Sequence, residues 1–259
     1  MPQTPDDDLT GLLERWPYDP DDYIREVPGS DGQRKLQVRF PMGIEQYELD
    51  GRPDGLRPLG HESYLHYFLH LRRQAAESDD PDSFRLTTAD CDLLRDEAMI
   101  FSYRYDLLYQ RKNYELVVRD TSRNLAAFDL LSRYAESAED AESLELYRPF
   151  AVRLHYAARA MLCVKRRRFN EAVRMAQAGI QKLDQLDEID DHKWRRERKT
   201  ASAKLRRLAR QIRRARPLSP RERLQKELKR ALDREDYEVA AKLRDRIAAM
   251  NEADEATES

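Results

Sequence analysis

Residues 62–70 carry side chains whose types and spacing suit a metal ion. Glu62, His66 and His70 recur at intervals of four, so a helix would place all three on one face. Zinc requires three or four converging ligands, and a metalloprotease helix carries a glutamate between its two histidines as the general base. Here the residues between the histidines are Tyr, Phe and Leu. We therefore interpret the row as the polar face of an amphipathic helix and predict no metal site.

The rest of the sequence lacks the other common patterns of catalytic or cofactor-binding residues. The two cysteines, Cys91 and Cys163, form no Cys-x-x-Cys pair, and no nucleophile elbow is present. Gly51 and Gly55 lie close together, but a phosphate-binding loop would need a strand before it and a helix after it. We predict that the protein is not an enzyme and binds no cofactor.

Residues 191–216 form a strongly basic segment, with 12 Lys and Arg against two Asp and Glu, whereas residues 1–90 hold 10 basic and 19 acidic residues. Trp194, Leu205 and Ile212 fall on one narrow stripe of a helix, and basic side chains occupy the rest of its circumference. A nucleic-acid phosphate backbone suits such a face. The candidate contacts are Lys204, Arg206, Arg207, Arg210, Arg213 and Arg214.

The alternative for this segment is a connecting helix without a ligand. A run of charge does not by itself specify a partner. Its cations would then be solvated or paired with the acidic N-terminal segment.

Near the C-terminus, two apolar stripes at helical spacing flank a short polar turn. The first runs from Leu224 through Leu228 to Leu232, and the second begins at Tyr237 and ends at Ile247. Asp236 stands where a carboxylate would cap the second helix. The adjacent alanines 240 and 241 would let the two helices approach closely. The pattern predicts a helical hairpin over residues 217–250.

From Leu224 to Ile247 the chain reads Leu-x3-Leu-x2-Ala-x4-Asp-Tyr-Glu-x-Ala-Ala-x-Leu-Arg-Asp-x-Ile, which resembles the UVR motif. This helical hairpin is shared by the excinuclease subunits UvrB and UvrC, and similar hairpins occur in Clp-type ATPases and in the activator of a bacterial protein arginine kinase. The alternative is an ordinary αα-hairpin. The chain has no GxxxxGK[ST] loop and no room for helicase or nuclease domains, so we predict that it is not an excinuclease subunit.

The resemblance implies that the hairpin docks on another protein, which in the UvrB–UvrC case carries a second hairpin of the same type. We predict that the Tyr237 ring packs between the helices near Leu228, Ala231 and Leu232, while an exposed shoulder faces the partner. The predicted docking residues are Leu224, Leu228, Tyr237, Glu238, Ala240, Ala241, Leu243, Arg244, Asp245 and Ile247.

Glycine and proline separate a turn-rich start from a helical remainder. Seven of the eight glycines and eight of the twelve prolines fall within the first 60 residues. Alternation at Leu36, Val38 and Phe40, with turn residues on either side, predicts a three-stranded β-meander over 24–49. The helices that we expect after it span 61–77, 88–111, 114–136, 141–167, 170–187, 192–215, 220–233 and 236–250.

A weak internal repeat links two of these helical pairs. Residues 113–119 align with residues 168–174, and Tyr156, Ala160 and Phe169 resemble the aromatic and small positions of a tetratricopeptide (TPR) hairpin. The offset of 55 residues differs from the usual 34. We interpret 88–136 and 141–187 as two TPR-like pairs, which usually offer a groove to a partner.

The predicted fold is mainly α. The expected parts are a meander segment at 1–60, a TPR-like helical bundle at 61–190, a basic connecting helix at 191–216, a UVR hairpin at 217–250 and an acidic tail at 251–259. Charged residues make up 37% of the 259, and no run of about 18 apolar residues suggests a membrane span. The start of the chain has no signal-peptide pattern, so we expect a cytoplasmic bacterial protein.

Two functions follow as hypotheses. The first is a non-enzymatic adaptor that docks on another protein, which could itself carry a UVR hairpin. The second is an accessory factor of DNA repair whose basic helix binds nucleic-acid phosphates.

Overall fold

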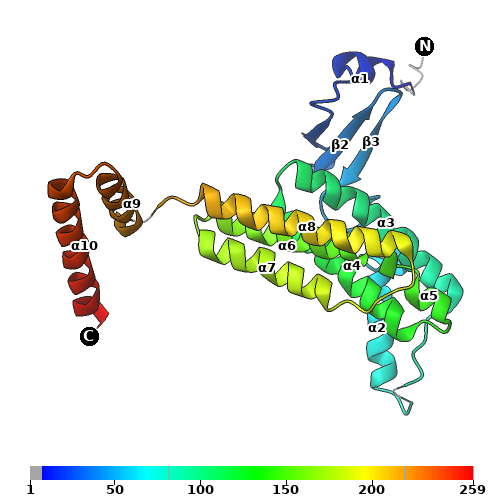
Figure 1. The fold of residues 1–259 in the computed structure, drawn as a ribbon. Helices are drawn as coiled ribbons and strands as arrows, with labels where there is room; N and C mark the ends of the chain where they lie inside the picture. The colour runs from blue at the N-terminus through cyan, green and yellow to red at the C-terminus, as the bar shows by residue number, and fades with distance from the viewer. Residues whose placement is uncertain (1–7, 81, 219, 259) are drawn as a thin grey trace. The chain divides into compact units, whose positions relative to one another are not determined.

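The computed structural model describes residues 8–80, 82–218 and 220–258, and it divides the chain into two compact units. The first unit, called the body below, ends at Ile212. The second, the hairpin unit, begins at Arg213. The described chain is mainly helical, with one small sheet, as the sequence predicts (Figure 1).

The sheet of the body is a three-stranded antiparallel meander. Strands β1 (Ile24–Pro28), β2 (Arg34–Phe40) and β3 (Gly43–Glu48) pair in chain order, with Leu36 opposite Tyr47 in the second pair. Leu36 and Val38 are buried as the alternation predicts, but Phe40, its third apolar residue, is 42% exposed, and Arg39 between them is buried as well. A short helix, α1 (Thr10–Arg15), precedes the sheet and was not predicted.

Most helices of the body agree with the predicted ranges within a few residues. Two 3-10 turns, Pro58–Gly60 and Glu145–Tyr147, lie among them. The helices are α2 (Tyr64–Ala76), α3 (Thr88–Gln110), α4 (Tyr114–Tyr134), α5 (Ala138–Glu142), α6 (Arg148–Lys165), α7 (Phe169–Asp184) and α8 (His192–Ala215).

The single helix predicted over 141–167 is wrong, because the structure interrupts it between Glu142 and Arg148. Pro149 is the second residue of α6. Proline fits the first turn of a helix, where its missing N–H costs nothing, but it breaks a helix interior. The chain therefore makes the short α5 and a 3-10 turn before α6 starts.

The long helices pack in sequence order, α3 on α4, α4 on α6 and α6 on α7, and α8 lies across the last pair (Figure 1). Leu205 of α8 packs with Val152 and Leu183, and Ile212 packs with Ala160 and Ala176. The basic helix is thus part of the body over most of its length, seated by the apolar stripe that the sequence shows.

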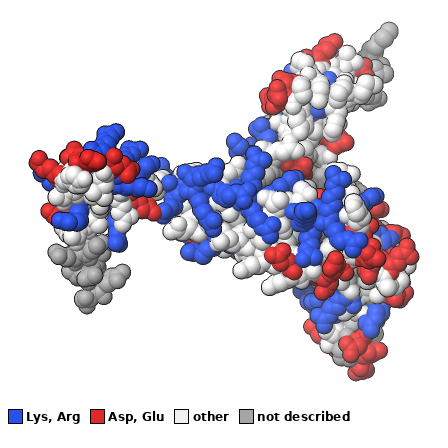
Figure 2. Space-filling model, in the orientation of Figure 1, with Lys and Arg blue, Asp and Glu red and all other residues white. Residues whose placement is uncertain are grey.

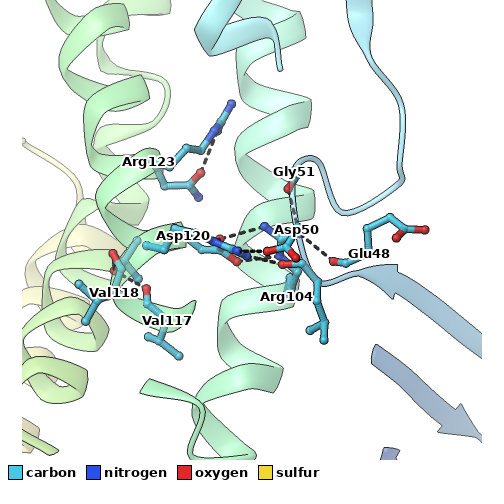
Figure 3. Close-up of polar contacts among 12 residues, drawn as sticks. Glu48, Asp50, Gly51, Arg104, Val117, Val118, Asp120 and Arg123 are labelled. Carbon is cyan, nitrogen blue, oxygen red and sulfur yellow. Dashed lines mark hydrogen bonds and ion pairs between the residues drawn. The ribbon is translucent and has the colours of Figure 1, made fainter. Parts of the chain in front are cut away.

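A buried ion pair fixes the meander to the helices (Figure 3). Arg104 of α3 donates from Nε and Nη2 to the two carboxylate oxygens of Asp120 in α4, at 2.7 and 2.8 Å. Its remaining nitrogen, Nη1, donates to the main-chain carbonyls of Glu48 and Gly51, at 2.8 and 2.9 Å. One guanidinium therefore joins α3, α4 and the end of β3.

Three helical pairs, α3–α4, α6–α7 and α9–α10, share one turn geometry. Helices α9 (Pro220–Asp233) and α10 (Tyr237–Glu258) belong to the hairpin unit. In each turn a residue without glycine's freedom adopts a φ of 59°: Lys112, Arg167 and Glu235. The next N–H then bonds to a carbonyl five residues earlier, at 2.8 to 2.9 Å. An aromatic residue starts the second helix each time: Tyr114, Phe169 and Tyr237.

Candidate functional site

The turn of the C-terminal hairpin is closed by its own main chain and by Asp236. The Asp236 N–H donates to the Ala231 carbonyl at 2.9 Å. This bond satisfies one of the main-chain carbonyls at the C-terminal end of α9. Its carboxylate accepts the Val239 N–H at 3.2 Å. Asp236 therefore caps α10, as the sequence predicts. Helix α10 continues to Glu258, beyond the predicted end at residue 250.

The two helices of the hairpin unit meet over a small apolar core. Ala231, Ala240 and Leu243 are buried, and Leu224 and Leu228 pack against them. Ala231 and Ala240 place little bulk between the helices, which allows them to approach closely, but Ala241, which the sequence paired with Ala240 in this role, is exposed. Ile247 is half-buried on the same side of α10. Five of the predicted docking residues therefore stabilise the hairpin itself: Leu224, Leu228, Ala240, Leu243 and Ile247.

The other predicted docking residues lie outside this core. Glu238, Ala241, Arg244 and Asp245 are exposed, so the predicted shoulder of α10 faces solvent within this unit. Arg244 and Asp245 place opposite charges side by side, with 75% and 76% of their side chains exposed. These positions are open to a partner without any change in the hairpin.

The predicted position of Tyr237 is wrong. Its ring does not pack between the helices, because Tyr237 is 68% exposed. Leu232, expected beside it, is 49% exposed. Tyr237 is the first residue of α10, and the side of that helix facing α9 begins at Ala240 instead. Leu232 is one position beyond the buried Ala231, so a helix turns it about 100° away from the core. Val239, 42% exposed, adds a third apolar side chain that the sequence did not single out.

The equivalent aromatic residues in the body are covered. Tyr114 is 6% exposed and belongs to a cluster with Leu154 and Ala158 of α6, while Lys165 Nζ lies 5.1 Å from its ring centre. Phe169 is half-buried against the cluster that holds Ile212 of α8. In both cases the next long helix of the chain packs on the aromatic residue that closes the turn.

The six candidate nucleic-acid contacts are all exposed on α8: Lys204, Arg206, Arg207, Arg210, Arg213 and Arg214. Figure 2 shows Lys and Arg side chains gathered along this helix. In the part of the chain that the structure describes, none of the six has a carboxylate within 4 Å. Arg195, near the start of the helix, does have one, since it pairs with Asp190 at 3.1 Å. The acidic N-terminal segment therefore provides no ion pair to these six in the described chain.

The histidine row of α2 lies on a partly exposed helix face. His66 Nε2 is 3.9 Å from a Glu62 carboxylate oxygen, and His66 Nδ1 is 2.9 Å from the Ser63 hydroxyl. The His70 ring lies 5.4 Å from that of His61. Over residues 8–80, 82–218 and 220–258, no group of three His, Cys, Asp or Glu side chains converges as metal ligands would.

The two cysteines are free thiols in different settings. Cys91 is buried in the helical core, where burial raises its pKa to about 11, and Cys163 is half-buried.

Within the described chain, no helix combines the length and the apolar character needed to cross a bilayer.

Comparison with known proteins agrees with the hairpin geometry. The family model described as the UvrB/uvrC motif matches residues 221–253. Neither the curated proteins nor the solved structures gave a match to the chain. The matched residues begin in α9, include the Asp236 cap and run into α10. The C-terminal hairpin of this protein is therefore a UVR motif.

Proposed function

We propose that this protein is a non-enzymatic bacterial adaptor whose UVR hairpin docks on another protein through the exposed side of its turn and of α10. The observation that carries this proposal is the uncovered Tyr237. In the two body hairpins with the same turn, a neighbouring helix packs on the equivalent aromatic residue. In the hairpin unit Tyr237 and Leu232 stay exposed, and a partner helix would bury both.

The size of the hairpin supports the same proposal. Ala231, Ala240 and Leu243 form its buried core, and alanine buries little apolar area. A unit this small gains little stability from its own core. Packing a partner against Tyr237 and Leu232 would bury additional apolar area outside that core.

The exposed residues of α10 describe the surface that the partner should fit. Ala241 follows Tyr237 by one turn and leaves space for a helix to approach closely. Arg244 and Asp245 come next and offer one charge of each sign, which would favour a partner with complementary charges and fix its position. A helical pair, including a second UVR hairpin, has the shape for this surface.

Replacing Tyr237 with serine tests the proposal. The full chain, carrying an affinity tag, should recover a specific partner protein from a bacterial lysate, and Tyr237→Ser should reduce that recovery at least tenfold. Because the ring is exposed, the helical circular dichroism of the variant should match that of the parent. Recovery is quantified by mass spectrometry and then confirmed by titration with the purified partner.

A pair of charge exchanges supplies the matched control. Arg244→Asp/Asp245→Arg on α10 should weaken binding, whereas Glu227→Arg/Arg230→Glu on the exposed side of α9 should not. Both exchanges keep the net charge. Equal recovery by all variants, or equal loss in both exchanges, would contradict docking through this surface.

A second function rests on the six cations of α8 that have no carboxylate partner in the described chain. We propose as the alternative that this face binds a nucleic-acid backbone in an accessory role linked to DNA repair. Each neutralised phosphate releases counterions, so the logarithm of affinity should fall steeply with the logarithm of salt concentration. The apolar stripe of α8 is buried in the body, so its basic side is free to face a phosphate backbone.

Neutralising Lys204, Arg206, Arg207, Arg210, Arg213 and Arg214 to glutamine tests this alternative. Fluorescence anisotropy with a labelled DNA duplex should show weaker binding and a shallower salt slope, by about 0.9 for each phosphate that the variant no longer neutralises. The affinity for the partner protein of the hairpin should not change. An unchanged affinity and slope for DNA would rule out this face.

A further inference from the structure

A pocket in the body lies apart from both surfaces considered so far. Its volume is about 570 Å³, and it is lined by α3, α4, the start of α6 with the 3-10 turn before it, and the first two turns of α8. Pockets for small organic ligands typically have about 300–1,000 Å³ and mostly apolar walls with a few polar groups. This pocket fits that description in size.

Its walls are largely aromatic and aliphatic. Phe128 and Leu144 are buried in the helical core, and Phe150 joins them from α6. Leu146 and Tyr147 line the same pocket from the 3-10 turn and are 36% and 45% exposed. Binding of an apolar group to such walls is favourable, because it removes apolar side chains from contact with water.

The polar groups deep in the pocket are neutral. Asn124 is buried, and its amide is already occupied: Nδ2 donates to the Ala98 carbonyl at 2.8 Å, and Oδ1 accepts from Arg123 Nη1 at 2.9 Å. Tyr105 is buried beside it, and burial raises the pKa of its hydroxyl above the ordinary value. The hydroxyl thus stays protonated at neutral pH, and the floor carries no charge.

The charge of the pocket is at its mouth and is mostly positive. Lys193 and Arg196, in the first two turns of α8, are exposed and line the pocket together with His192. Within the described chain, neither Lys193 nor Arg196 has a carboxylate within 4 Å. Two adjacent cations above an apolar cavity would attract an anionic group.

Glu197 also lines the mouth and places one negative charge there. Burial lowers the pKa of Arg153, and the nearby carboxylate of Glu197 partly restores it. The two groups therefore interact electrostatically. The mouth thus holds two cations, Lys193 and Arg196, against the one carboxylate of Glu197, so its charge is positive on balance.

We propose that this pocket binds a small amphipathic anion. Its apolar part would lie against Phe128 and Phe150, and its carboxylate would face Lys193 and Arg196. A cation of the same shape would be repelled by the two positive charges at the mouth. A purely polar anion would leave the apolar walls in contact with water. The proposal does not depend on the hairpin or on nucleic-acid binding.

Decanoate is a suitable probe, titrated into the full chain below its micelle concentration by isothermal calorimetry. We expect binding at one site per chain. Decanol has the same apolar chain without the charge, and it should bind at least tenfold more weakly. Decyltrimethylammonium, with the opposite charge, should bind more weakly than decanol.

Three variants locate the site. Lys193→Gln/Arg196→Gln should weaken decanoate at least tenfold and leave decanol unchanged. Lys204→Gln/Arg207→Gln removes the same charge from the same helix away from the pocket and should bind decanoate like the parent. Ser102→Leu adds bulk to the pocket wall, where Ser102 is half-buried, and should weaken both ligands.

The outcomes are decisive in either direction. The proposal is overturned by an absence of decanoate binding, by decanol binding as tightly as decanoate, or by equal losses in the two double variants. A folded Ser102→Leu variant, judged by its parent-like circular dichroism, that binds both ligands normally would also overturn it.

Discussion

Arg104 and Asp120 place opposite charges where neither side chain reaches solvent, with 0% and 1% of their side chains exposed. Removing one member of such a pair leaves an unpaired charge in a medium that solvates it poorly. Asp120 also accepts from Arg119 Nε at 2.9 Å, so two cations depend on it. The sequence does not predict this pair, because two charged residues 16 positions apart form no periodic pattern.

We predict that Asp120→Ala lowers the free energy of unfolding by about 3–5 kcal/mol, the usual cost of breaking a buried pair. Urea denaturation followed by circular dichroism measures the change. Asp50→Ala removes an ion pair with Arg119 in which the Asp50 side chain is 82% exposed, and it should have a much smaller effect. Similar losses in both variants would show that burial does not set the strength of the Arg104 anchor.

His155 gives the body a dependence on pH. Burial, helped by the nearby Arg159, lowers the pKa of His155 from 6.5 to about 4, and its Nδ1 lies 3.0 Å from the Thr121 hydroxyl. Between these two values the unfolded chain binds a proton that the folded chain does not. The free energy of unfolding should therefore fall as the pH falls from about 6.5 towards 4.

His155→Gln should remove this contribution. Urea denaturation at pH 7 and at pH 5 should show a smaller loss of stability for the variant than for the parent. Above pH 7 the histidine is neutral in both states, so the difference between the two proteins should no longer change with pH. A parallel loss in parent and variant would mean that His155 is not the group responsible.

At the residue scale, the sequence predicted which stretches of the hairpin are helical and amphipathic better than it predicted on which side of a helix a given side chain lies. It indicated that Ala240 faces the other helix of the hairpin and that Arg244 and Asp245 face outward, and the structure agrees. It failed for Tyr237, because an apolar residue next to a stripe looks like a member of it. Only the exact start of α10 decides on which side that ring lies.

At the element scale, helices α6, α7 and α8 meet at Gly179. A Cβ at that position would lie 2.6 Å from Tyr156 Cβ and 2.8 Å from Leu205 Cδ1, closer than real carbon atoms approach. The glycine therefore permits the contact that seats α8 on the body. Glycine is otherwise unfavourable within a helix, by about 1 kcal/mol relative to alanine.

We predict that Gly179→Ala destabilises the body despite the better helix propensity of alanine, because overpacking typically costs about 1–3 kcal/mol. Thermal unfolding and urea denaturation measure the change. Gln177→Ala, on the exposed side of α7, is the control and should stay close to the parent. A more stable Gly179→Ala variant would indicate that α8 can shift without loss.

Helix boundaries were predictable where capping and turn residues agree with the apolar spacing. Helices α8 and α9 begin and end as expected, and the meander has its three strands. The break before α6 was missed although Pro149 was visible, because the apolar pattern continues through it. The shared geometry of the three turns was hidden too, since Lys112, Arg167 and Glu235 are not residues that normally mark a left-handed turn. The TPR-like interpretation of the body stays a prediction.

At the scale of the whole molecule, the small net charge of −2 conceals a strong separation of charge. Residues 1–90 carry nine more acidic than basic residues, and residues 191–216 carry ten more basic than acidic ones. A molecule of this kind can attract copies of itself when screening is weak. Composition alone showed this separation, but which cations lack acidic neighbours required the structure.

We predict reversible self-association at about 0.01 M salt, where charges interact over about 30 Å, and its loss at about 1 M, where the range falls to about 3 Å. Sedimentation velocity at the two salt concentrations measures it. The glutamine variant of the six α8 cations should remain a single species under both conditions. Association that strengthens with salt would point to apolar contacts instead.

The anchor beneath the meander also sets an order of events during folding. Its guanidinium comes from α3 and its carboxylate from α4, so the seat for the end of β3 exists only after those two helices have paired. On the ribosome the N-terminal residues emerge first. The end of β3 therefore gains this anchor only after residue 120 has left the exit tunnel. During synthesis, the apolar face of the sheet, with Leu36 and Val38, therefore lacks its anchored helical cover while the chain between Glu48 and Asp120 is being made.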